Sequence, residues 1–436
     1  MSGFPSRFLV AASTALLLAA CHTSARAQEP PEEEKPDFGE YNPNRGFLVA
    51  RSDRGELSAR FFTYIRYLNQ KGLDPTYTDT FGQTTTLDRR QDIQFQKVTL
   101  NFYGWIMDPK LRYLLYAWTA NTSQGQGAQV VIGGNMNYRF NPRLTLGGGI
   151  DALPGVRATE GNFPFWLTVD NRLIADEYFR PSYTMGIWAR GEVVDRLTYR
   201  LMLGNNLSQL GVDAGELDDG LNTVSAGLIW LPTTGEFGTG GGFGDFDTHE
   251  DVATRLAAHF TTSDENFQAQ PNTDLFENVQ IRLSDGNSIF EPNLFGPGIQ
   301  IEDATYHMFC TDGGIKYRGF SLDGEFYWRW VDNFRGPGVG TLAFDEISDN
   351  GFQLQASAMV MPSVLQAYTG YSKVISDNGD PWDLRFGLNW HPWHNHVVRW
   401  NYEYLYTHRS PVGGLSLPTQ VGGTGEIFYT SFQINF

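Results

Sequence analysis

Apolar and polar side chains alternate along the segment that ends at Phe436. Phe428, Phe432, Ile434 and Phe436 occupy every second position, and Thr430 is the one interruption in the row. Polar residues fill the intervening positions from 431 to 435. Period-two alternation places the two sets on opposite faces of a β-strand. The pattern therefore predicts a terminal strand with one apolar face and one polar face.

The same alternation recurs along the chain in about sixteen segments. They lie near residues 57–68, 94–106, 110–120, 128–140, 143–151, 182–193, 197–204, 222–231, 251–262, 304–316, 318–330, 351–360, 364–372, 382–390, 397–406 and 426–436. Most have roughly the 9–11 residues that a tilted strand needs to cross a bilayer. The pattern predicts an all-β chain.

The predicted connections alternate in length. Tight turns are expected at 107–109, 141–142, 194–196 and 361–363, and long loops at 69–93, 152–181, 205–221, 263–303, 331–350 and 407–425. Short turns at one end and long loops at the other are typical of a transmembrane antiparallel β-barrel. The Gly-rich stretch 232–250 is an exception, because it is long where a short turn is expected.

Alternation alone does not separate a membrane barrel from a soluble sandwich of two sheets, because either has one apolar face per strand. Aromatic clusters favour the barrel. Trp328 and Trp330 share a face, and a second cluster comprises Trp400, Tyr402, Tyr404 and Tyr406. Rings gathered in this way suit the interface between membrane and water.

The segment near 304–316 conflicts with a simple alternation of faces. Asp312 falls in the same row as Tyr306, Met308 and Cys310. An acid in an apolar row indicates a break of phase, and Gly313-Gly314 is the expected position of a β-bulge that resets the register.

The amino-terminal residues predict secretion. Arg7 precedes a largely apolar stretch, Phe8 to Ala20, and Ala25-Arg26-Ala27 offers a cleavage site, so residues 1–27 are interpreted as a signal peptide. Leu18-Ala19-Ala20-Cys21 also resembles a lipoprotein processing site that would acylate Cys21. Cleavage after residue 27 would leave Cys310 as the only thiol, so no disulfide within the mature chain is expected. Residues 28–55 are predicted to be a charged periplasmic leader, and residues 56–436 the barrel.

Composition narrows the class of protein further. Aromatic residues make up 14% of the chain, charged residues 19%, and there are 48 glycines. These values suit a barrel with aromatic girdles, a polar lumen and long loops. The net charge of -17 argues against a nucleic-acid-binding protein. Loss of residues 1–27 would remove two arginines and no acid, and would make the chain more negative.

Two blocks of sequence resemble a known family. Residues 53–57 followed by 61–70 look like the first strand of outer-membrane porins of the phosphate-selective O and P type, and residues 197–206 resemble another strand, which ends in a Gly-Asn corner. The resemblance implies a barrel of about 16 strands that acts as a diffusion channel and forms a homotrimer. It also implies a third loop folded inward, which here would be 152–181.

The candidate charged residues do not form the dense run of Arg and Lys that a selective phosphate path needs. The expected constriction loop carries Arg157, Arg172 and Arg180 against Glu160, Asp170, Asp176 and Glu177. The bases predicted to line the strand walls are Arg60, Arg66, Lys97, Arg139, Arg143, Arg190, Arg200, Arg255, Arg329, Arg385 and Arg399. The acids in polar phase are Asp151, Glu192, Asp251, Asp323, Glu325, Asp383 and Glu403. Eleven bases against seven acids predict a mildly positive lumen.

Two interpretations of these charges remain open. The first is that lumen charges pair with one another and keep the pore wet. The second is a weak preference for anions, to which Arg60, Arg66, Arg190 and Arg200 would contribute. Small hydrophilic solutes are the expected cargo in either case.

Other chemistry is sparse in the sequence. His391, His394 and His396 could bind a metal, but they lie at an expected turn, and neither metal nor cofactor is predicted. Acids in 213–220 are expected to meet lipopolysaccharide through divalent ions. No catalytic motif is found, so the chain is not expected to be an enzyme. Two alternatives are a barrel lipase and a secreted soluble β-protein that binds or hydrolyses polysaccharide with carboxylate pairs.

Overall fold

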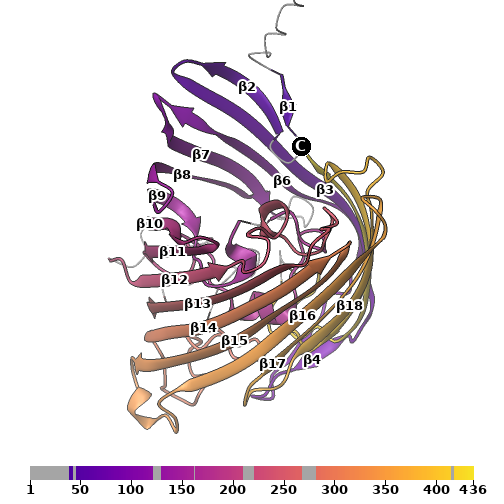
Figure 1. The fold of residues 1–436 in the computed structure, drawn as a ribbon. Coiled ribbons are helices and arrows are strands. Elements are labelled where there is room, and N and C mark those ends of the chain that lie inside the picture. The colour runs from indigo at the N-terminus through magenta and orange to yellow at the C-terminus, as the bar shows by residue number, and fades with distance from the viewer. Residues whose placement is uncertain are drawn as a thin grey trace, which may run out of the picture.

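The chain forms a closed antiparallel β-barrel of 16 strands in a computed structural model that describes residues 39–42, 46–120, 129–161, 163–209, 220–267, 281–413 and 417–436 (Figure 1). The strands are β3 (Gly55–Leu73), β6 (Gln91–Ile106), β7 (Asp108–Ala120), β8 (Gln129–Asn141), β9 (Leu144–Ala152), β10 (Tyr183–Val194), β11 (Leu197–Gly204), β12 (Thr223–Trp230), β13 (Ala253–Asn266), β14 (Asp303–Tyr317), β15 (Phe320–Arg335), β16 (Ile347–Met361), β17 (Leu365–Ile375), β18 (Trp382–Trp390), β19 (Val398–His408) and β20 (Gly425–Asn435). Each strand pairs with its neighbours in sequence, and β20 pairs with β3 to close the barrel.

The sixteen segments predicted from alternation coincide with these strands, and the predicted all-β barrel is confirmed. The connections divide the barrel into two ends. At the turn end, most connections are short, such as Met107 between β6 and β7 and Asp195-Arg196 between β10 and β11. The loop end carries the long connections, including a small sheet of β4 (Thr76–Thr78) and β5 (Thr84–Thr86) and the 3-10 helix η4 (Val339–Thr341).

The residues before β3 add to the sheet. In the predicted leader, β1 (Tyr41–Asn42) pairs with β2 (Gly46–Ser52), and β2 pairs with the first residues of β3. The described part of that segment, expected to be a charged leader, therefore extends the barrel wall at the turn end. The predicted signal peptide and Cys21 lie outside the described residues.

The outer face of the barrel is apolar. Ile132 has 77% of its side chain exposed and Ile93 has 72%, values that would be costly for large aliphatic groups in water. Exposed tryptophans lie near strand ends, with Trp230, Trp390 and Trp400 at the turn end and Trp328 toward the loop end. An apolar band between aromatic girdles is the surface of a barrel that sits in a bilayer.

Two connections run into the barrel and lie against its inner face. The inserted segment, residues 153–182 between β9 and β10, contains η2 (Arg157–Thr159) and helix α2 (Ile174–Phe179) and occupies the middle of the barrel in Figure 1. The plug segment, residues 231–252 between β12 and β13, contains η3 (Thr239–Gly241). The backbone N–H of Phe243 donates to the carbonyl of Phe165 over 3.1 Å, so the two segments meet inside. This accounts for the long stretch found where a short turn was expected.

The predicted bulge at Gly313-Gly314 is wrong. Both glycines pair in continuous register with β13 and β15, and Asp312 lies in the same buried row as Tyr306 and Met308. That row faces inward, where its apolar members pack against the inserted segment in one core cluster. An apolar row faces the lumen here because the lumen is filled with protein at this point.

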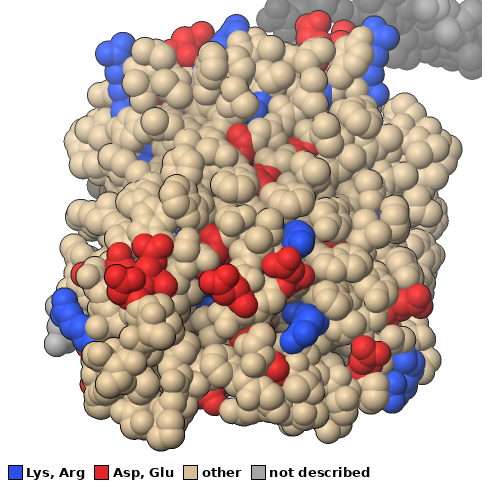
Figure 2. All heavy atoms as spheres, turned by 90° about the horizontal axis from the view of Figure 1, so that it is seen from below, with Lys and Arg blue, Asp and Glu red and all other residues tan. Residues whose placement is uncertain are grey.

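The loop end is acidic. Seen from that end, acidic side chains outnumber basic ones on the surface (Figure 2). Asp345, Glu346, Asp377 and Asp380 belong to two loop-end connections that carry no Lys or Arg. The acids at 213–219, predicted to meet lipopolysaccharide, lie outside the described residues. Among the described residues, no helix is long and apolar enough to cross a membrane.

Candidate functional site: the lumen

Buried ion pairs fasten the inserted segment to the inner wall. Arg157 is fully buried, and its Nη1 lies 2.6 Å from Oδ1 of Asp323 on β15. Its backbone N–H donates to Glu325 over 3.0 Å, and its Nη2 donates to the carbonyl of Gly242 in the plug segment over 3.2 Å. A buried guanidinium needs partners on every side because water does not reach it. Arg157 therefore joins the wall and both inward-folded connections.

A second cluster holds the next residues of the inserted segment. Arg255 on β13 donates to Glu160 over 2.8 Å and to Asp312 over 2.6 Å. Nε2 of His259 lies 2.9 Å from Asp312, and its Nδ1 lies 2.9 Å from the carbonyl of Pro154. Both ring nitrogens thus face acceptors, which suits the imidazolium form with two donors. Two cations then balance two carboxylates in the buried cluster.

Glu160, His259 and Asp312 form the one group of at least three potential metal ligands found in the described residues. Arg255 already donates to both carboxylates, so the cluster is explained as a charge-balanced anchor. The histidines of the β18–β19 connection differ from this cluster. His391 is buried, and its ring and that of His396 both pack on Phe246 of the plug segment. Burial, assisted by the charge of Arg399, lowers the pKa of His391 to about 2, so its ring is neutral.

The irregular part of the inserted segment is held through its backbone carbonyls. Arg399 on β19 donates to Thr168 over 3.0 Å, and Arg66 on β3 donates to Val169 over 2.6 Å. Arg385 on β18 donates to the carbonyl of Arg172 over 2.7 Å and is paired with Asp383. Carbonyls outside regular secondary structure need such donors when they are buried. These wall arginines are therefore bound to the inserted segment and are buried.

Helix α2 carries its own charge network. Arg172 lies 3.0 Å from Asp176, and Arg180 lies 2.8 Å from Glu177. All four side chains are buried. Arg329 on β15 forms an ion pair with Asp349 on the neighbouring strand β16. Charges on this side of the lumen thus pair with one another.

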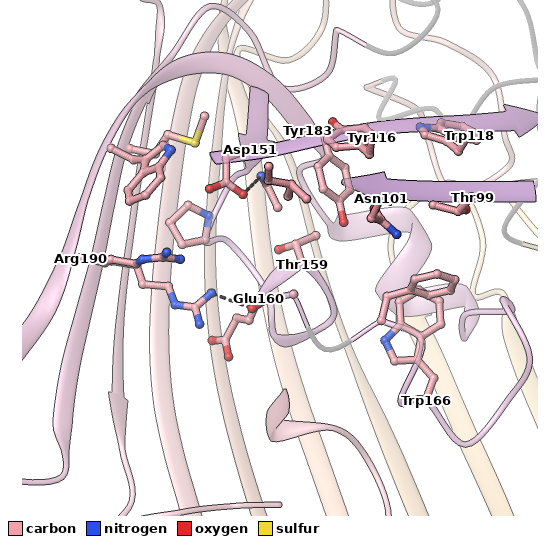
Figure 3. Close-up of a pocket in the computed structure, with 18 of the residues that line it drawn as sticks. Thr99, Asn101, Tyr116, Trp118, Asp151, Thr159, Glu160, Trp166, Tyr183 and Arg190 are labelled. Atoms are coloured by element: carbon pink, nitrogen blue, oxygen red, sulfur yellow. Dashed lines mark hydrogen bonds between the residues drawn. The ribbon is translucent and has the colours of Figure 1, made fainter. Parts of the chain in front are cut away.

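The opposite side of the lumen is open. A cavity of about 320 Å³ lies between the inserted segment and the wall from β6 to β11. Figure 3 shows Arg190 at one end of this cavity and Trp118 and Trp166 at the other. Asp151 and Glu160 also line it. Among the described residues, this cavity lies inside the barrel and beside the inserted segment.

A row of arginines crosses the open wall. In the strand register, Arg139 on β8 lies opposite Thr145, Thr145 lies opposite Arg190, and Arg190 lies opposite Arg200 on β11. Adjacent strands are roughly 4.8 Å apart, so these bases are close neighbours on one face. Like charges directly opposite one another destabilise a sheet. The row, defined by Arg139, Arg190 and Arg200, therefore carries an electrostatic cost.

The contacts of this basic row differ from those of the buried arginines. Arg190 lies over the ring of Trp188 at 4.7 Å, and Arg200 donates to the backbone carbonyl of Glu160 over 2.8 Å. Neither forms an ion pair with a described carboxylate within 4.0 Å. Asp151, the nearest acid in the cavity, accepts the N–H of Ala152. The row keeps its charge available to the lumen.

A β-bulge directs Lys97 into the cavity. The register of β3 and β6 shifts between Phe62 and Tyr64, opposite Lys97, whose φ is 49°. Its Nζ lies 2.7 Å from Asp170 of the inserted segment. A bulge re-aims a side chain in this way, and a positive φ in a residue with a Cβ costs free energy that the surrounding contacts must offset. No pattern of residues around Lys97 indicates this bulge.

The remaining predicted lining residues lie at the edges of the lumen. Arg60 is half-buried, donates to Asn435 over 3.0 Å and lies over the ring of Phe165 at 5.6 Å. Arg143 lies in the turn between β8 and β9, outside the strand wall on which it was expected. The aromatic residues of the cavity were not among the predicted site residues. Tyr116 and Trp118 share the inward row of β7 with Leu114, and a strand apolar on both faces gives no signal for which face meets water.

No protein-family model matches the chain, and no curated protein matches it in sequence. Several solved structures share its fold. The anion-selective porin from Comamonas acidovorans matches with a TM-score of 0.54 and 10% identity, over 88% of this chain and 100% of that one. The outer membrane channel DcaP of Acinetobacter baumannii matches with a TM-score of 0.53 and 8% identity, over 90% and 100%. The outer-membrane protein OmpT of Vibrio cholerae matches with a TM-score of 0.53 and 11% identity, over 89% and 100%. At such identities the likeness concerns the barrel fold.

Proposed function

We propose that the chain is a passive outer-membrane channel for small hydrophilic solutes, with a weak preference for anions. The basic row of Arg139, Arg190 and Arg200 carries the anion preference. Arg190 and Arg200 line the cavity and form no ion pair with a described carboxylate, whereas Arg255 and Arg385 on the opposite side are paired with acids. Fixed donors lining a narrow passage replace part of an anion's hydration.

The membrane location is supported by the exposed apolar band and by the likeness to outer-membrane porin structures. In this orientation the turn end faces the periplasm and the acidic loop end faces outward, toward lipopolysaccharide bridged by divalent ions. A homotrimer is part of the proposal, and one similar structure, OmpT of Vibrio cholerae, is described as a trimer form. Cross-linking in detergent tests the trimer.

Phosphate selectivity is not part of this proposal. The resemblance to the phosphate-selective porins extends to strand layout, but the cavity mixes its bases with Asp151, Glu160 and Asp170. A path for a multiply charged anion needs an unbroken run of cationic donors. A general preference for anions fits the observed mixture.

Reversal potentials in a potassium chloride gradient across a planar bilayer test the proposal. We expect a chloride preference near 0.1 M salt, where acids of the loop end that lie more than about 10 Å from the pore are screened. The double variant Arg190→Gln/Arg200→Gln is expected to lose that preference. Arg51→Gln, which removes an exposed charge that pairs with Glu56 at the turn end, is the matched control and should keep it. A cation-selective unaltered channel would overturn the anion preference, and absence of any conductance would overturn the channel function.

A further inference from the structure

The open cavity is unusually rich in aromatic side chains for a water-filled path. Its lining includes Tyr116, Trp118, Phe163, Trp166, Tyr183 and Trp188. The lumen of a general diffusion porin is polar, because passing solutes exchange hydration for polar wall groups. Rings on both sides of a passage therefore require an explanation.

Packing explains only some of these rings. Phe163 packs on Phe62 at 4.8 Å and on Trp166 at 5.1 Å, and these contacts help to seat the inserted segment. Tyr116 and Tyr183 pack instead on Trp118 in a separate cluster on the open wall. The packing partners of Trp118 in this cluster, Tyr116, Val131 and Tyr183, all belong to strands of the wall. Its rings are arranged to present an apolar surface to the cavity.

The two groups of rings face each other across Lys97. The Lys97 ammonium lies 5.4 Å from the ring centre of Trp118 and 5.2 Å from that of Phe163. Asp170 neutralises this ammonium at 2.7 Å. The Lys97–Asp170 pair thus lies between the two groups of rings without adding net charge, and the rings that line the cavity are suited to stack on a flat apolar group.

The other part of the cavity is cationic. The Arg190 guanidinium lies over the ring of Trp188 at 4.7 Å and lines the cavity. Arg200 lies directly opposite Arg190 in the register. A planar guanidinium with free edge donors binds a carboxylate through two parallel hydrogen bonds. Asp151 offsets part of this charge, so a single carboxylate is favoured over a dianion.

We propose that this cavity is a binding site for small aromatic monocarboxylates. The ring lies against the Trp118 cluster, and the carboxylate lies against Arg190 and Arg200. The volume of about 320 Å³ is at the lower end of small-molecule sites, which suits a single substituted ring. The proposal rests on the proposed channel function and names the solute class for which the channel is built.

Neutral sugars are the competing class, because sugars also stack on aromatic rings. A sugar site needs carboxylate or amide groups around the ring edge to accept hydroxyl protons. Here Arg190 and Arg200 donate and do not accept, while Glu160 already binds Arg255 and Asp151 already accepts the N–H of Ala152. The chemistry of the cavity therefore favours an anion with an apolar body.

Current block in planar bilayers tests the site with matched probes. Benzoate combines ring and charge, acetate has the charge alone, and benzyl alcohol has the ring alone. We expect benzoate to interrupt the ion current at a concentration about tenfold lower than either of the others, since each part of the site contributes on the scale of one ring contact or one ion pair. Calorimetric titration of the detergent-solubilised protein with benzoate gives a readout that does not depend on conduction.

Variants assign the two ends of the site. Trp118→Leu is expected to weaken benzoate binding about three- to tenfold. Arg190→Gln is expected to weaken benzoate and leave benzyl alcohol unaffected. Trp400→Leu, which removes an outward-facing ring, is the control and should leave benzoate binding unchanged. If Trp118→Leu does not fold, the comparison of benzoate with acetate on the unaltered protein decides the question alone.

Three results would overturn the aromatic-carboxylate site: equal block by acetate and benzoate, equal binding of benzyl alcohol and benzoate, or tighter binding of glucose than of benzoate. Each can occur in a channel that conducts and prefers chloride, so each leaves the proposed function standing. A protein that conducts no ions, or that prefers cations, refutes the proposed function instead.

Discussion

Replacing Arg157 by glutamine is expected to loosen the inserted segment and to raise both the conductance and the current noise of the channel. Arg157 is fully buried and binds Asp323 on β15 over 2.6 Å. It also binds the plug segment at Gly242 and lies 4.2 Å from the ring of Phe243. Glutamine keeps the backbone contact to Glu325 and removes the charge.

The magnitude follows from the unpaired carboxylate that remains. Removing one partner of a buried ion pair costs about 3–5 kcal/mol, because the other charge stays buried without compensation. Each 1.4 kcal/mol is a factor of ten in an equilibrium constant, so the population with a detached segment should rise by roughly two to three orders of magnitude. Other anchors, including Arg255 and Arg399, still hold the rest of the segment. The expected result is local detachment within an intact barrel.

Single-channel recording measures this effect. The variant is expected to show brief excursions to higher conductance, whereas Arg51→Gln should behave like the unaltered channel. Adding Asp323→Asn to Arg157→Gln removes the unpaired carboxylate. It should restore part of the stability with which the inserted segment is attached to the wall, as a double-mutant cycle reports. Heat-modified mobility in gels checks that the barrel itself remains folded. Unchanged conductance and noise in Arg157→Gln would refute the view that this ion pair seats the inserted segment.

Three further predictions concern other parts of the barrel. Deleting Phe436 removes two backbone hydrogen bonds with Phe61, of 2.6 and 2.9 Å, and a ring contact at 5.2 Å. The loss of about 2–4 kcal/mol of stability should lower the temperature of heat-induced unfolding in gels. An unchanged temperature would contradict a stabilising role of Phe436. Burial alone would lower the pKa of His249 in the plug segment, but hydrogen bonds to two carboxylates, one of them Asp245, outweigh it and raise the pKa above 6.5. The stability that protonated His249 gives to the plug segment is complete below pH 6.5 and is lost as the pH rises through the raised pKa. Amide exchange of the plug segment, corrected for its intrinsic pH dependence, should therefore increase in mildly alkaline buffer, and it should not do so in His249→Gln. Cys310 is buried, so maleimide should label it after thermal unfolding and not before, as mass spectrometry would show; labelling of the folded barrel would indicate an open path to the core cluster.

The strands could be predicted from sequence because alternation reports directly on the two faces of a barrel wall. The prediction was wrong where the inner face does not meet water. Tyr306, Met308 and Cys310 are apolar and face inward, because the inserted segment covers them. A local pattern records polarity, and it does not record which distant segment lies against it.

The chemistry of the lumen shows the same limit. Arg385 and Arg190 both occupy alternating strands and look alike in sequence. Arg385 is fully buried against Arg172 and Asp383, whereas Arg190 is exposed to the cavity. The difference arises from which side of the barrel the inserted segment occupies. That choice depends on many contacts between distant residues, such as Arg157 with Asp323, and no single motif encodes it.

The seam of the barrel has a consequence for how the molecule is assembled. Two strands pair with the same edge of β3: β2 pairs with its first residues and β20 with the remainder. The hydrogen bond between Arg60 and Asn435 at this seam joins residues 375 positions apart in the chain. During synthesis β3 emerges long before β20, so its hydrogen-bonding edge stays vacant while fifteen other strands are made. Vacant strand edges recruit foreign strands, and pairing across such a separation is slow. The free edge of β3 must therefore be shielded by a chaperone until β20 pairs with it. Shortening β20 should leave the polypeptide bound to that chaperone.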